Sequence, residues 1–80
     1  MPGGSLHFIL ADGELLTLAQ GELSEVYELL WKLEPQKGAI SVAAMIRVAA
    51  RSDLLGSPID LDETQSEAMR EAVASVRYSA

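Results

Sequence analysis

The chain has 80 residues, 49% of them apolar, and its twelve acidic and six basic residues give a net charge of −6. This length supports one modest core with little room for a catalytic cleft and cofactor, and the negative charge disfavours phosphate backbones and anionic lipid surfaces. The absence of cysteine excludes disulfides, thiolate zinc sites and cysteine nucleophiles.

Residues 1–5 lack the basic start and the long apolar run of a signal peptide. No segment approaches the roughly 18 apolar residues of a membrane span. We therefore expect a flexible leader over residues 1–5, a single domain over residues 6–78 and a cytoplasmic location.

Residues 6–19 are predicted to form a β-hairpin, because two β-prone runs flank the dipeptide Asp12-Gly13. Asp-Gly favours a two-residue type I′ turn, in which both central residues need a positive φ. This turn places Leu10 opposite Leu15 and His7 opposite Leu18. One face then carries Leu6, Phe8, Leu10, Leu15, Thr17 and Ala19. The other carries His7, Ile9, Leu16 and Leu18. Both faces are largely apolar, so we expect one to pack on helices and the other to meet a partner.

Two helices are predicted after the hairpin. Apolar residues recur at helical spacing from about Glu22 to Leu33, and Pro35 ends this pattern. The second helix, about Ile40 to Arg51, has apolar residues almost all round, which is typical of a helix that is buried on most sides. Arg47 and Arg51 lie four residues apart and mark its one polar edge.

A short third strand and a third helix complete the prediction. Ile59-Asp60-Leu61 alternates in polarity and is expected to add to the edge of the hairpin. Asp62 is a good N-cap with Gln65 at the N3 position, so a helix begins directly after Asp62. Its Arg70 and Arg77 are expected to face water. The sequence thus predicts a small single α+β domain, ordered β-β-α-α-β-α, with the N-terminal hairpin packed on three helices.

The segment Asp60-Leu61-Asp62-Glu63-Thr64 resembles the DxDx[TV] nucleophile motif of haloacid-dehalogenase-type phosphatases. In that family the first carboxylate attacks phosphorus, the second acts as general acid or base, and magnesium offsets the charge. The family also needs a large doubly wound domain after the motif. Helix capping by Asp62 explains the same letters. We therefore expect no catalytic residue in this segment.

Metal and cofactor sites are not expected either. Asp60, Asp62 and Glu63 are acidic and close in sequence, but the spacing lacks the glycine and the distal glutamate of a calcium-binding EF-hand. His7 is the only histidine, so a histidine-based metal site would need carboxylates for every other ligand. We expect a protein with no metal, no cofactor and no enzymatic activity.

The favoured functional hypothesis is a non-enzymatic protein-interaction module, most simply a homodimer. The interface residues expected from the sequence are Ile9, Leu16, Leu18, His7 and Trp31. If His7 lies in that interface, association would depend on pH between about 5 and 8.

The alternative is a small regulator or inhibitor that acts on a nucleic-acid-binding partner, or a winged-helix-like regulator. In the second helix, only Arg47 and Arg51 carry side chains suited to contact phosphates or bases. Direct binding of nucleic acid is therefore disfavoured, and we expect no membrane partner.

Overall fold

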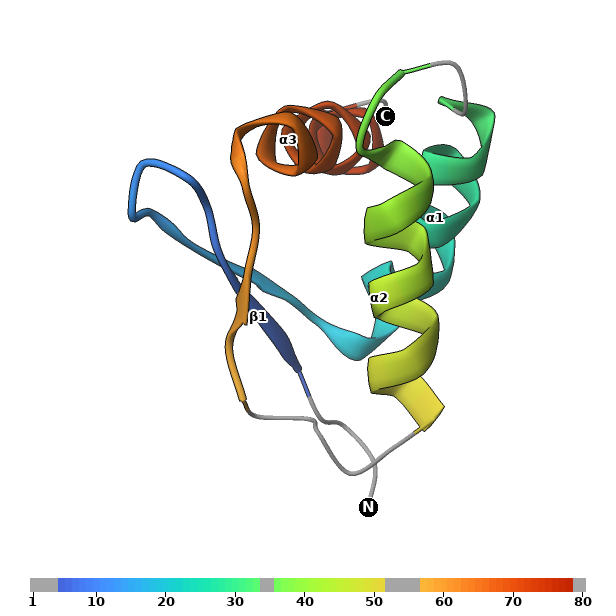
Figure 1. Ribbon diagram of the computed structural model, residues 1–80. Helices are drawn as coiled ribbons and strands as arrows, with labels where there is room; N and C mark the ends of the chain where they lie inside the picture. The colour runs from blue at the N-terminus through green and yellow to red at the C-terminus, as the bar shows by residue number, and fades with distance from the viewer. Residues whose placement is uncertain (1–4, 34–35, 52–56, 79–80) are drawn as a thin grey trace.

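The computed structural model describes residues 5–33, 36–51 and 57–78 and shows an α+β fold ordered β-β-α-α-β-α, as the sequence predicts (Figure 1). Its elements are β1 (Leu6–Ile9), β2 (Leu15–Leu18), α1 (Gln20–Lys32), α2 (Ala39–Arg51), β3 (Ile59–Asp60) and α3 (Glu63–Tyr78). The leader expected over residues 1–5 lies, apart from Ser5, outside the described residues, and so does Pro35.

The three strands form a mixed sheet in the order β2-β1-β3, so the first strand of the chain is the central one. β1 is antiparallel to β2 and parallel to β3. Phe8 lies opposite Ile59, and the Leu61 N–H donates a 2.9 Å hydrogen bond to the Ile9 carbonyl. Parallel pairing requires a long crossover, which α1 and α2 provide. The predicted third strand is confirmed.

The hairpin turn differs from the predicted one. The Gly13 N–H donates to the Leu10 carbonyl at 2.8 Å, and the Leu10 N–H donates to the Glu14 carbonyl at 2.9 Å, which encloses a three-residue loop. Gly13 has a φ of 89°, whereas no described non-glycine residue, Asp12 included, has a positive φ. This geometry is a type I turn followed by a glycine bulge, not the type I′ turn.

The longer loop shifts the strand register by one residue. The observed partners are Leu6 and Leu18, His7 and Thr17, Phe8 and Leu16, and Ile9 and Leu15. Because side chains alternate along a strand, a slip of one residue turns every side chain of β2 to the opposite face. The predicted placement of Leu16 and Leu18 on the outer face is therefore wrong, since both face the helices.

The core lies between the sheet and the three helices, which are all on one side of it (Figure 1). Each element contributes the residues of one face. The fully buried side chains of largest volume are Leu6, Phe8, Leu18, Val26, Leu30, Val42, Ser66 and Met69.

The helix α2 is less buried than predicted. Val42, Ala43 and Ile46 face the core, but Ala44 is exposed and Val48 is 60% exposed. On this side of α2, Ala44 and Val48 line a groove that β3 borders.

Local capping residues determine where α1 and α3 begin. At the start of α3, the Gln65 N–H donates to Asp62 Oδ1 at 2.8 Å, and the Asp62 N–H donates to Gln65 Oε1 at 2.9 Å, which confirms the predicted cap. α1 begins at Gln20, earlier than predicted, because Glu22 Oε1 accepts a 3.0 Å hydrogen bond from the Ala19 N–H.

Gly38 lets the first turn of α2 approach the backbone of α3. Its φ is 87°, and a Cβ atom at this position would lie 2.8 Å from the Thr64 carbonyl oxygen and 2.9 Å from the Gln65 nitrogen. Glycine is therefore required both for the backbone conformation and for the close approach of the two helices.

We expect Gly38→Ala to lower the free energy of unfolding by at least about 1 kcal/mol, because of the strained φ and the contact with α3. Gly21→Ala is the matched control, since a Cβ on Gly21 would meet no atom within 4 Å. It should be neutral or stabilise α1 by up to about 1 kcal/mol. Urea denaturation followed by circular dichroism measures both, and equal stabilities would contradict the close approach at Gly38.

Candidate interaction surface

The outer face of the sheet is the side that points away from the three helices. It consists of His7 and Ile9 from β1, Leu15 and Thr17 from β2, and Asp60 from β3. Leu15 is 61% exposed, and Ile9, its cross-strand partner, is half-buried. The outer face therefore carries one small apolar pair, at the end of the ladder nearest the turn, with polar side chains beside it.

Two residues of the outer face are joined by a hydrogen bond between His7 Nδ1 and Thr17 Oγ1 of 2.9 Å. An imidazole beside a hydroxyl is also the arrangement of a base and a nucleophile. Here both groups belong to opposite positions of an antiparallel strand pair, and the hydrogen bond is an exposed one. Cross-strand pairs of this kind stabilise a sheet, and this is the role that the geometry supports.

The structure separates the five predicted interface residues. His7 and Ile9 lie on the outer face as expected. Leu16 is partly buried on the core side, and Leu18 is fully buried. Trp31 is 43% exposed on α1, where its ring packs edge-on against Tyr27 with 6.3 Å between ring centroids, so it belongs to the helical layer.

Sequence reasoning missed Leu15, because the assumed turn placed it on the core side. A three-residue loop over Ala11-Asp12-Gly13 also puts glycine at the position that needs a positive φ. The residues of the turn are compatible with both loops. Leu15 could have been found by comparing the two registers for the apolar side chains of β2 that each one buries.

The helix α3 is tied to the hairpin by two arginines that the sequence places in water. Arg70 Nη2 lies 2.7 Å from Asp12 Oδ2 and 3.2 Å from Glu14 Oε1, at the turn. Arg77 pairs with Glu22 through distances of 2.7 and 3.1 Å. Both side chains are exposed to water, as the sequence predicts, and each also forms an ion pair that the sequence did not predict.

These contacts change the acidity of the carboxylates. The hydrogen bond from Arg77, followed by that from the Ala19 N–H, lowers the pKa of Glu22 from 4.5 to about 2. The Glu14 N–H, followed by Arg70, lowers the pKa of Asp12. Both groups therefore stay ionised at neutral pH and serve as structural anchors.

The acidic residues elsewhere do not assemble into a metal site. Within the described ranges, no three histidine, cysteine, aspartate or glutamate side chains come together to hold an ion. Asp62 is occupied with capping α3. Calcium binding by Asp60, Asp62 and Glu63, which the sequence already disfavours, thus receives no support from the geometry.

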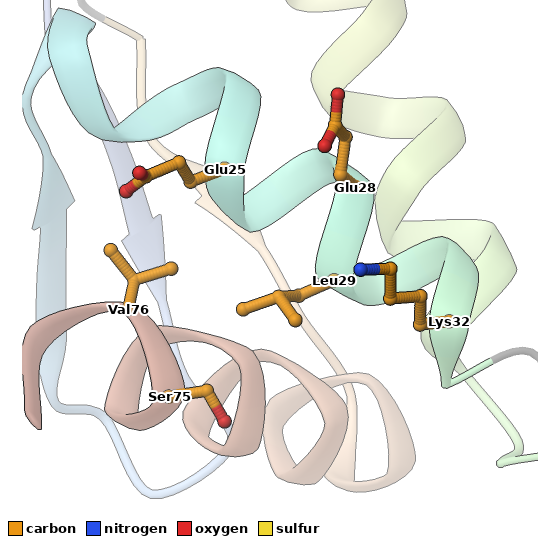
Figure 2. A pocket seen from close by; sticks show the side chains of 6 residues that line it. All are labelled: Glu25, Glu28, Leu29, Lys32, Ser75 and Val76. Carbon is orange, nitrogen blue, oxygen red and sulfur yellow. The ribbon is translucent and has the colours of Figure 1, made fainter. Parts of the chain in front are cut away.

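A groove of about 350 Å³ lies between α1 and α3. Figure 2 shows Leu29 of α1 and Val76 of α3 pointing into the space between the helices, while the carboxyl group of Glu28 points away from it. The charged groups on its rim do not converge on one point, so the groove has no centre that would hold a charged ligand.

A second groove, of about 390 Å³, lies between α2 and β3 and is almost entirely apolar. Its lining residues are Ala44, Met45, Val48, Ala49, Ser57, Pro58 and Ile59.

Comparison with known proteins identifies no relative: no protein-family model, curated protein or solved structure matches the chain. Among the described helices, none combines the length and the apolar character that crossing a membrane would require.

We expect the ion pair between Glu22 and Arg77 to make the fold sensitive to acid. The folded pKa of Glu22, about 2, lies below its ordinary value of 4.5. The pair therefore stabilises the protein above pH 4.5, and this contribution is lost as the pH falls from 4.5 towards 2. Urea midpoints at about pH 7 and about pH 3 should differ less in Glu22→Gln than in the wild type.

Glu25→Gln is the matched control for that experiment, because Glu25 is an exposed carboxylate on the same helix. It removes the same charge and should leave the wild-type acid dependence in place. An identical acid dependence in Glu22→Gln and Glu25→Gln would show that the Glu22 pair does not cause it.

Proposed function

We propose that this domain is a non-enzymatic protein-interaction module that pairs with a second copy through the outer face of its sheet. The observation that carries the proposal is the exposure of Leu15 beside Ile9 on that face. An apolar pair on the face of a sheet usually packs against another layer, and no described helix lies on this side (Figure 1).

Two such sheets would pack face to face at about 10 Å, as in other two-sheet proteins. Ile9 and Leu15 of each copy would fill the space between the sheets. The polar side chains of His7, Thr17 and Asp60 would form the rim, where they keep contact with water. The pH dependence expected from His7 stays a prediction.

The size of this face limits the strength of association. Strands of four, four and two residues, at about 3.3 Å per residue and about 4.8 Å apart, cover only about 160 Å². A standard interface buries about 800 Å² on each partner. Each buried Ile or Leu contributes about 1.5–3 kcal/mol, against an association cost of about 4–15 kcal/mol. We therefore expect a weak dimer.

The net charge also weakens the association of two copies. Each copy carries a charge of −6, so two copies repel each other at low ionic strength. Added salt screens this repulsion and should strengthen the dimer.

The nucleic-acid alternative has less support. Arg70 and Arg77, two of the few cations, are held by acidic side chains of the hairpin and of α1. Arg47 is exposed on α2, but its neighbours Ala44 and Val48 offer no contact to phosphates. A cytoplasmic location stays a prediction from the sequence.

Leu15→Thr should weaken the dimer by about tenfold or more, since each dimer loses two buried leucines while threonine keeps the preference for a strand. Val48→Thr is the matched control, because Val48 and Leu15 are 60% and 61% exposed but lie on different surfaces: Val48 lines the groove between α2 and β3, and Leu15 lies on the outer face of the sheet. Sedimentation equilibrium up to about 1 mM protein, at physiological salt, measures the dissociation constants.

A wild-type chain that stays monomeric over this range would overturn the proposal. A loss of association in Val48→Thr but not in Leu15→Thr would instead place the interface at the groove between α2 and β3.

A further inference from the structure

The strand β2 forms one edge of the sheet, and the direction of its backbone groups follows from the ladder. Leu10 and Glu14 share a hydrogen bond between their backbones, so the hydrogen-bonded pairs continue in steps of two along the hairpin. Leu15 and Thr17 fall between these pairs. Their N–H and C=O groups therefore point away from β1, towards the open edge of β2.

The edge of β2 is occupied at one of these groups. Arg77 Nη2 donates a 2.9 Å hydrogen bond to the Thr17 carbonyl. The same guanidinium is held by Glu22, whose carboxylate also accepts the Ala19 N–H. Arg77 is thus fixed in place by a charged partner that is itself anchored at the start of α1.

The spacing of the two arginines matches the strand. Arg70 and Arg77 are seven residues apart, which is about 10.5 Å along a helix. Glu14 and Thr17 are three residues apart, which is about 10 Å along a strand. The helix α3 therefore runs beside β2, with Arg70 bound to side chains at the turn and Arg77 bound to the backbone of the strand itself.

We propose that Arg77 guards the free edge of β2 and prevents a second copy of this chain from pairing with it strand to strand. Edge strands present unpaired backbone groups on which another chain can form a ladder, and proteins block them with charged side chains or covering elements. The Arg77 guanidinium occupies an acceptor that such a ladder would need, and it places a positive charge at that edge. This inference concerns the edge of the sheet and does not depend on association through the outer face.

The test compares Arg77→Met with Arg70→Met. Methionine keeps an apolar stem but removes every hydrogen-bond donor and the charge. Both variants replace an arginine of α3 with methionine. Arg70→Met breaks an ion pair with the hairpin turn, and Arg77→Met breaks one with α1. Only Arg77→Met uncovers a backbone acceptor of β2.

We expect Arg77→Met to self-associate at least tenfold more tightly than the wild type, while Arg70→Met behaves as the wild type does. Amide hydrogen exchange identifies the mode of association, because the Leu15 and Thr17 N–H groups become protected only when a strand pairs along this edge. Equal association of the two variants would overturn the proposal. So would association of Arg77→Met without new protection at these two amides.

Circular dichroism shows whether Arg77→Met is folded. If it is not, Glu22→Gln provides the second variant, because it keeps Arg77 and weakens its anchor. Glu22→Gln should show the same protection at Leu15 and Thr17 to a smaller degree, and an unchanged exchange pattern would contradict the role of Arg77.

Discussion

The burial of the inner side chains of β1 is the constraint on which the rest of the structure depends. Leu6 and Phe8 are fully buried and Leu10 is nearly so, and together they place β1 at the centre of the sheet and against the helices. Because strand side chains alternate, this choice sends His7 and Ile9 to the opposite face. The hairpin register then decides which residues of β2 join them.

The helix α3 connects the parts of the chain. Its first turn contacts the backbone at Gly38, Ser66 accepts a 2.9 Å hydrogen bond from the Ala11 N–H at the hairpin turn, and its two arginines bind acidic side chains of the hairpin and α1. Part of the negative charge of the chain is thus used to fasten α3 to the sheet. The composition alone suggests that the acidic residues only keep the surface solvated. Here some of them form ion pairs that hold the fold together.

The outer face of the sheet and the edge of β2 differ in how far other parts of the molecule cover them. The outer face carries Leu15 and Ile9 with no described element over them. The edge of β2 is covered at Thr17 by Arg77. Face-to-face contact between folded sheets is limited in area and reversible, whereas pairing of edges can continue from molecule to molecule. The open outer face and the covered edge are both consistent with the proposed face-to-face pairing.

The sequence by itself determined the type and order of the elements, because helical periodicity, strand alternation and the cap formed by Asp62 and Gln65 act between near neighbours. The turn type, the register that exposes Leu15, and the partners of Arg70 and Arg77 were decided only in the tertiary structure. Asp12-Gly13 is compatible with two loop lengths, so the competition for burial between Leu15 and its neighbours settles which one forms. That competition depends on packing against helices far along the chain, so the local sequence of the hairpin cannot decide it.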